Sequence, residues 1–348
     1  SVQVMKRRAE GFYASDYALF GLAFLLVLTL CVCAGSVSLP VSDTFKAVFA
    51  AVTGQPAPDT MAGRIVVSSR LPRVLCVALT GAALSLCGGA MQGLLRNPLA
   101  DGSTLGVSSG AALGAALAIA FGIVIPGLPG LGTMGMAMVF AFLSLLLILS
   151  LAYKLDYSLA TNTIILIGVV FSMFAGSILS LVITFAGSKV HTITFWLMGS
   201  LSGSTYRDVL LLFGALLVFG TVILRRAREL NAFAVGEENA RSVGVDVRRV
   251  KLTVLICVAA LIGVCVSLGG TIGFVGLVMP HILRLLVGPN HRRLLPACIF
   301  GGACFLMLAD LLARVLLSPL ELPIGVVTSF IGSLVFVFIF YRSRKGAA

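Results

Sequence analysis

The chain has 348 residues, 59% of them hydrophobic and 11% charged, with a formal net charge of +12 at pH 7. Such a composition excludes a soluble globular domain. Several stretches of about 18 or more residues carry few or no charges, which is the length that a helix needs to cross the ~30 Å hydrocarbon core of a membrane. Strands of a membrane β-barrel would instead alternate apolar and polar residues. The sequence therefore predicts an all-α, polytopic membrane protein with one transmembrane domain over residues 1–348.

About ten transmembrane spans are expected from the lengths of the apolar runs. They lie near residues 17–39, 74–95, 105–125, 134–153, 163–187, 209–224, 252–268, 271–287, 295–317 and 324–341. Only Gly269 and Gly270 separate the seventh span from the eighth, and this pair predicts a tight turn or a broken helix. Gly106, Gly110 and Gly114 stand four residues apart, a spacing that favours close helix packing in lipid.

The basic residues predict the orientation, because Lys and Arg collect in the cytoplasmic loops of membrane proteins. With the N-terminus inside, 18 of the 25 Lys and Arg residues fall on the cytoplasmic side and seven on the outer side. An odd number of spans would place one charged end on the wrong side, so both termini are expected in the cytoplasm. The net positive charge thus indicates orientation rather than nucleic-acid binding.

The most polar part of the chain is the stretch 225–251, which holds seven basic and four acidic residues in 27 positions. Within it, Glu237, Glu238 and Arg241 fall within about one helical turn, with small and apolar residues on another face. This pattern predicts a short amphipathic helix that ends at Gly244. A helix of this kind suits docking into the groove of a partner protein, here on the cytoplasmic side.

Motifs for catalysis and for energy coupling are almost absent. The sequence contains no G-x-x-x-x-G-K-[ST], so the chain has no P-loop of its own for ATP. The eight cysteines lie in apolar runs, where free cysteine packs as a small hydrophobic side chain, and they predict neither disulfides nor a metal site. Near mid-membrane the exception is Asp310, with Arg314 four residues later; this pair is interpreted as a structural ion pair or as a proton relay. The energy for transport is therefore expected to enter through the stretch 225–251.

Six long motifs in a fixed order carry a specific resemblance. They are RLPR at 70–73, GAALSLCGGAMQGLLRNPLADGSTLGVSSGAALGA at 81–115, FWLMGSLSG at 195–203, VGEENARSVGV at 235–245, GFVGLVMPHILRLLVGPNHRRLLP at 273–296 and LADLLARVLLSPLELPIGVVTSFIG at 308–332. Over nearly the whole chain, they resemble the permease subunits of the ABC importers for ferric siderophores, haem and cobalamin.

The resemblance implies a ten-span subunit that works as a homodimer in the bacterial cytoplasmic (inner) membrane. Two ATPase subunits would lie below it and one substrate-binding protein above it. ATP and Mg²⁺ would be bound by the ATPase, so this chain would hold no cofactor and would not itself be an enzyme. The stretch 225–251 would rest on the ATPase. The residues that match the family's contact motif are Gly236, Glu237, Ala240, Arg241, Gly244 and Val245.

The resemblance also implies roles at both membrane surfaces. On the outer side, Arg70, Arg73 and Arg314 match arginines that pair with glutamates of the binding protein. A plainer interpretation of Arg70 and Arg73 is that they snorkel at the head of the second span. On the cytoplasmic side, the family's gate lies after the second span and before the fifth, where Asn162 replaces the Ser or Thr that is common there. The matching gate residues are Asn97, Leu99, Thr161 and Asn162.

The substrate implied by the resemblance is a metal chelate, with a ferric siderophore first, then haem, then cobalamin. Because the metal would arrive already chelated, no metal ligand is expected on the chain. Trp196, the only tryptophan, is expected to anchor the outer interface, and nearby His191 is a secondary candidate for a haem-related role. Three alternatives stay open: an ion-coupled secondary transporter, a membrane-embedded enzyme, and a heterodimer with a paralogous permease.

Overall fold

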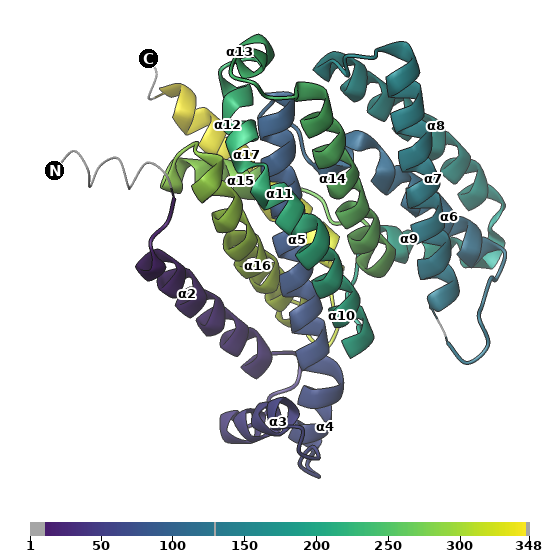
Figure 1. Ribbon diagram of the computed structural model, residues 1–348. Helices are drawn as coiled ribbons and strands as arrows, with labels where there is room; N and C mark the ends of the chain where they lie inside the picture. Colours follow the sequence, from purple (N-terminus) through teal and green to yellow (C-terminus); the bar gives the residue numbers. More distant parts are fainter. Residues whose placement is uncertain (1–10, 129, 346–348) are drawn as a thin grey trace.

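The computed structural model describes residues 11–128 and 130–345, and the side chains up to residue 342. This part of the chain is a bundle of helices joined by turns (Figure 1). The helices of the membrane bundle are α2 (Ala14–Cys33), α5 (Leu71–Leu95), α6 (Val107–Ala120), α7 (Leu131–Leu155), α8 (Thr161–Phe185), α10 (Tyr206–Ala215), α11 (Thr221–Arg225), α14 (Val247–Gly269), α15 (Val275–Val287), α16 (His291–Val315) and α17 (Ile324–Lys345).

The ten expected spans agree with this helix set. Among the described residues, eight helices or continuous helical runs are long and apolar enough to cross a membrane, and α6 and α15 are shorter apolar helices. The second span is longer than expected, because α4 (Met61–Ile65) and a π-helical turn, Val66–Arg70, continue directly into α5. A second π-helical turn, Leu216–Gly220, joins α10 to α11. As predicted from Gly269 and Gly270, α14 ends at this pair and α15 begins five residues later.

Helix α5 forms the centre of the bundle, where it packs against α16, α15, α14 and α10. In the most apolar stretch of its span, 89% of the residues are buried. The contacts are close because small residues meet: a side chain at Gly88 would collide with the backbone of Gly276, and one at Gly81 with that of Gly302. In lipid, where no hydrophobic force drives helices together, such close approach supplies the packing energy.

Besides α4, four short α-helices of the described part of the chain lie outside the expected spans. Two of them, α12 (Ala227–Ala234) and α13 (Glu237–Ser242), form the polar stretch predicted from the sequence. The other two, α3 (Val41–Thr53) and α9 (Val190–Leu197), were not predicted. Helix α3 buries one face: Ala47 and Ala50 are buried, whereas Phe45 and Phe49 are exposed.

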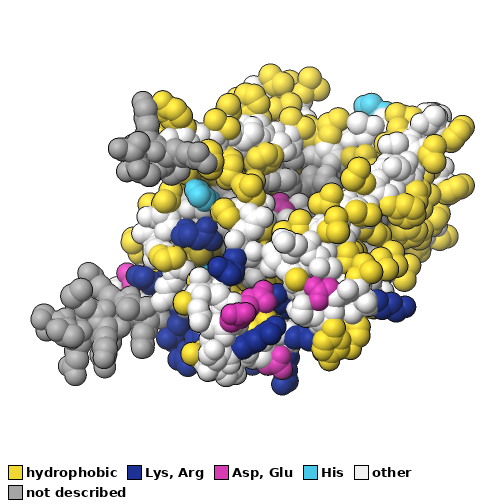
Figure 2. All heavy atoms as spheres, turned by 90° about the horizontal axis from the view of Figure 1, so that it is seen from above, with side chains coloured by type: hydrophobic (Ala, Val, Ile, Leu, Met, Phe, Trp, Pro, Cys, Tyr) yellow, Lys and Arg dark blue, Asp and Glu magenta, His cyan; other side chains and the backbone are white. Residues whose placement is uncertain are grey.

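The two ends of the bundle differ in charge. Helix α13 and the end of α17 lie at the upper end in Figure 1, and α3 and α4 lie at the lower end. Figure 2 shows the upper end face on, with Lys and Arg side chains gathered over it and hydrophobic side chains at its margin. By the positive-inside rule, the upper end faces the cytoplasm. Exposed basic residues on the polar stretch include Arg225, Arg228, Arg241 and Arg249.

Candidate functional site

The predicted amphipathic helix is present as α13, and its surroundings explain why it forms. Gly236 has a φ of 115°, a conformation that glycine adopts readily, and it turns the chain from α12 into α13. Ala240 is 1% exposed and anchors the helix on the bundle, whereas Glu238 and Arg241 face solvent. Gly244, with a φ of 88°, follows the helix end, as predicted. Helix α13 and the turn at Gly244 together form a polar knob on the cytoplasmic face. Val245 and the following turn connect this knob to α14.

A buried lysine joins this knob to the rest of the bundle. Lys251, in the first two turns of α14, is 0% exposed. Its ammonium group forms an ion pair with the carboxylate of Glu237 in α13. The same group donates a hydrogen bond of 2.8 Å to the backbone carbonyl of Leu159, in the turn between α7 and α8. A single side chain therefore connects the polar knob to the turn that precedes the fifth span.

That turn is held by a second charged residue, Asp156. Its carboxylate accepts hydrogen bonds from the Ser158 hydroxyl (2.6 Å), the Ala160 amide (3.0 Å) and the Thr163 hydroxyl (3.1 Å). These bonds satisfy donors at the start of α8, which would otherwise lack partners. Leu159 has a φ of 54° and a fully buried side chain. The turn is therefore held by the Asp156 carboxylate and by the hydrogen bond from Lys251 to the Leu159 carbonyl.

The predicted gate residues lie at helix ends on the cytoplasmic side. Thr161 and Asn162 are the first two residues of α8, directly after the turn that Asp156 and Lys251 hold. Asn97 follows α5, and its side-chain oxygen accepts a hydrogen bond of 2.9 Å from the Leu99 amide. The side chain of Leu99 is 59% exposed. The helix-stop interpretation of Asn97 therefore fits the geometry, and the gating role of all four residues stays a prediction.

The pH dependence of the Asp156 turn can be predicted. The hydrogen bonds from Ser158 and Ala160 lower the pKa of Asp156 to about 2, below the value of about 3.9 for an unfolded aspartate. Because the folded pKa is depressed, the stabilisation is complete above pH ~4 and is lost as the pH falls toward ~2. We expect Asp156→Asn to melt at a lower temperature than the wild type at pH 7. The difference should shrink between pH 4 and pH 2; a constant difference would contradict this assignment.

On the outer side, a cluster of charged residues surrounds Asp310. This aspartate is 1% exposed, and one of its oxygens lies 3.0 Å from Nη2 of Arg73 while the other lies 3.0 Å from Nε of Arg314. Arg73 also forms an ion pair of 2.7 Å with Glu321, which is at the surface end of the cluster. Two arginines thus share one buried carboxylate. The geometry is that of the structural ion pair, one of the two interpretations left open by the sequence.

Arg314 of this cluster and the nearby Arg70 bind the carbonyls at the end of α2. Arg314 donates hydrogen bonds to the carbonyls of Cys31 (3.0 Å) and Ala34 (3.1 Å). Arg70 donates to those of Val32 (3.3 Å) and Cys33 (3.2 Å), as well as to Val37. The last carbonyls of a helix lack intrahelical partners and carry partial negative charge, so guanidinium groups are suited to this position.

The outer arginines were expected to meet glutamates of a binding protein, yet the structure brings all three together inside the chain. The exposed fractions of Arg70, Arg73 and Arg314 are 6%, 8% and 3%. Their guanidinium groups are occupied by internal partners, and snorkelling toward solvent is not seen. Sequence analysis missed this internal role because the partners, apart from the pair formed by Arg314 and Asp310, lie far away in the sequence. The docking role stays a prediction.

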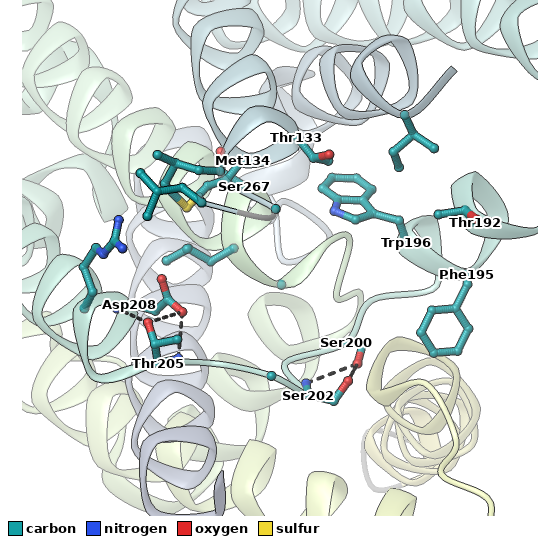
Figure 3. A pocket seen from close by; sticks show the side chains of 18 residues that line it. Thr133, Met134, Thr192, Phe195, Trp196, Ser200, Ser202, Thr205, Asp208 and Ser267 are labelled. Atoms are coloured by element: carbon teal, nitrogen blue, oxygen red, sulfur yellow. Dashed lines mark hydrogen bonds between the residues drawn. The ribbon is translucent and has the colours of Figure 1, made fainter. Parts of the chain in front are cut away.

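A cavity of about 570 Å³ opens near the same end of the bundle, between α9 and the ends of α7, α10 and α14. Figure 3 shows that Trp196 and Thr133 face each other across it, with Ser200 and Ser202 on a loop nearby. Its walls carry apolar and hydroxyl-bearing side chains, the aromatic rings of Phe195 and Trp196, and the charged side chains of Arg207 and Asp208. Trp196 is half-buried rather than set out at the surface, and His191 is exposed and does not line the cavity. Within the described residues, no group of three or more His, Cys, Asp or Glu side chains could hold a metal ion.

These features define a class of protein: a multi-span α-helical membrane protein with a polar knob on its cytoplasmic face. Comparison with known proteins then gives the family. The model of the FecCD transport family matches residues 22–342, so the chain belongs to the FecCD transport family. The resemblance inferred from the six motifs is confirmed at this level.

Relatives cover almost the whole chain. The ABC transporter permease protein YvrB of Bacillus subtilis is 40% identical over 94% of this chain and 94% of its own length. The hemin transport system permease protein HmuU of Yersinia pestis is 38% identical, with 93% and 96% covered. The cobalamin import system permease protein BtuC of Halobacterium salinarum is 38% identical, with 83% and 76% covered.

The fold agrees with a solved structure of the same kind. A structure described as an inward-facing conformation of a metal-chelate type ABC transporter superposes with a TM-score of 0.83 at 31% identity. The match covers 95% of this chain and 100% of the other. These relatives are transport permease subunits, not enzymes, and the all-α fold of this chain is that of the ABC permeases of this family.

Proposed function

We propose that the chain is the permease of a binding-protein-dependent ABC importer for a metal chelate, with a ferric siderophore first, haem second and cobalamin third. It works as a homodimer with two ATPase subunits and one substrate-binding protein in the bacterial inner membrane. Family membership and the hemin- and cobalamin-importing relatives support the substrate class. The cavity of about 570 Å³, lined by apolar, hydroxyl-bearing and charged side chains, has the volume of a site for a preassembled ligand rather than for a bare ion.

The observation that carries the proposal is the connection from α13 through Lys251 to the turn before α8. Helix α13 offers Glu238 and Arg241 to a partner on the cytoplasmic side. A force applied there reaches the Leu159 carbonyl through Glu237 and Lys251. In this proposal the ATPase contacts Gly236, Glu237, Ala240, Arg241, Gly244 and Val245, and its closure moves the gate at Asn97, Leu99, Thr161 and Asn162.

Binding-protein docking is the less direct part of the proposal. Arg70, Arg73 and Arg314 would have to exchange internal partners for acidic groups of the binding protein. Glu321, whose side chain is 35% exposed, is the accessible partner in the cluster. A glutamate of the binding protein that replaced Glu321 beside Arg73 would conserve the charge balance. Close interfacial charge pairs of this kind couple by about 1.5–7 kcal/mol.

The test is to purify the chain from its native membranes and determine the composition of the complex by native mass spectrometry. We expect two copies of this chain with two copies of a Walker-motif ATPase. In proteoliposomes containing the binding protein, a ferric siderophore should enter only with ATP, and a metal oxyanion offered in its place should not enter. Uptake that persists without ATP and follows an imposed proton or sodium gradient would establish the ion-coupled alternative instead.

A further inference from the structure

An apolar groove runs along the membrane-facing side of the bundle, away from the sites described above. It has a volume of about 480 Å³ and lies between α2 and the run from α10 to α11, with α5 and α16 as its floor. The floor is apolar: three alanines, Ala78, Ala82 and Ala303, lie among the larger residues Leu75, Leu79, Ile299 and Phe300. Leu210 and Leu217 on its rim are 71% and 58% exposed, so the groove is open toward the surrounding lipid.

The cytoplasmic end of this groove leads into a second, polar cavity of about 350 Å³. Leu224 lines both cavities. The same helices continue from one to the other: α2 supplies Phe24 to the groove and Tyr17 to the polar cavity, and α16 supplies Ile299 and then Arg292. The two cavities therefore share a wall at Leu224 and follow one another along the same helices. We call the pair the channel, which is apolar within the membrane and basic at its cytoplasmic mouth.

The charge at the mouth is strongly positive. Arg225 and Arg228 line it and are exposed, and neither forms an ion pair within the described part of the chain. The nearby Arg226 is paired with Glu229 at 3.0 Å, so that carboxylate is already neutralised. Asp16, next to Tyr17, accepts a hydrogen bond from the Tyr13 amide at 2.9 Å. An anion at the mouth would thus meet two available guanidinium groups.

The groove is long enough to hold one lipid chain. From Val209 to Arg225 the helical run extends about 24 Å at 1.5 Å per residue, which exceeds the depth of about 15 Å of one leaflet of the ~30 Å hydrocarbon core. An acyl chain in the groove would reach its headgroup at the level of Arg225 and Arg228. We propose that this channel binds an anionic glycerophospholipid of the cytoplasmic leaflet, with an acyl chain on the Ala78–Ala303 floor and its phosphate on the two arginines. The site does not depend on the transported substrate.

The test uses the full-length chain in nanodiscs of phosphatidylcholine, with phosphatidylglycerol of the same acyl chains added. Bound lipid is counted by native mass spectrometry. A basic residue near a membrane surface strengthens the binding of an anionic lipid about fivefold, so the wild type should prefer phosphatidylglycerol by about 30-fold. Arg225→Gln combined with Arg228→Gln should remove that preference. The matched control, Lys154→Gln with Arg249→Gln, removes two exposed charges from the same end of the bundle and should keep it.

A second variant tests the groove itself. Ala78→Phe places a ring on the floor and should lower the number of retained phosphatidylglycerol molecules, while the exposed arginines stay intact. Equal binding of the two lipids by the wild type would overturn the proposal, as would equal losses in the control pair. Displacement of phosphatidylglycerol by inorganic phosphate at equal concentration would show a free-anion site. A dimer that binds no lipid in the groove because a second copy of the chain covers it would also refute the proposal.

Discussion

Replacing Lys251 with methionine should separate ATP hydrolysis from transport. Methionine keeps the apolar volume of the lysine stem but removes the ammonium group that joins Glu237 to the Leu159 carbonyl. Glu237, with 27% of its side chain exposed, can turn to water, whereas the Leu159 carbonyl loses its partner at a cost of about 1–3 kcal/mol. In proteoliposomes with the ATPase and the binding protein, uptake per ATP hydrolysed should fall about tenfold or more.

The control for this prediction is Lys154→Met, which removes an exposed lysine near the cytoplasmic end of α7. It should leave the ratio of uptake to hydrolysis unchanged. Glu237→Gln should have an intermediate effect, because an amide still accepts a hydrogen bond from Lys251. A normal ratio in Lys251→Met, with the dimer intact by size-exclusion chromatography, would show that force reaches the gate by another route.

The second large effect is expected at Asp310. Asp310→Asn leaves Arg73 and Arg314 close together, with only Glu321 to compensate their charges. Removing one partner of a buried ionic cluster costs about 3–5 kcal/mol. The melting temperature of the purified chain should therefore fall by several degrees, and it should partly recover when Arg314→Gln is added, because the unpaired positive charge is then removed.

Asp59→Asn provides the comparison for Asp310. Asp59 lies 3.8 Å from Arg64 in an ion pair at the surface, where its side chain is 98% exposed. Such pairs contribute about 0–1 kcal/mol, so its melting temperature should change little. The proton-relay interpretation makes the opposite prediction for Asp310→Asn: normal stability, but loss of a pH-dependent transport step. Stability measurements therefore distinguish the two interpretations directly.

The fold was largely predictable because membrane spans are long and apolar, and length alone marks them. The helices that sequence analysis missed, α3 and α9, are short, and α3 buries only one face. The site was less predictable. The pair Asp310 and Arg314 is visible as an i, i+4 spacing, but Arg73 lies 237 residues before Asp310. No local sequence pattern predicts that Lys251 donates a hydrogen bond to the carbonyl of Leu159, which lies 92 residues earlier in the chain.

The outer arginines show a different reason for the mismatch. Both sequence interpretations, snorkelling and docking, place their charges at the surface. In the folded chain the unpaired carbonyls at the end of α2 form a negative site, and Arg70 turns inward to it. That site exists only once α2 has stopped at Cys33 beside the outer end of α5. A charge pattern read from the sequence does not include such backbone acceptors.

The hydrogen bonds from Arg70 and Arg314 to the end of α2 also have a consequence for how the protein is made. Helix α2 is the first described span to leave the ribosome, but one of the two arginines that bind its last carbonyls is Arg314, more than 280 residues later. Until α16 is inserted, the outer end of α2 therefore lacks half of its partners. During most of synthesis, the first described span therefore lies in the membrane without the hydrogen bonds that Arg314 later donates. A nascent chain arrested before Arg314 would thus be a poor substitute for the finished protein, even though most of its spans are already inserted.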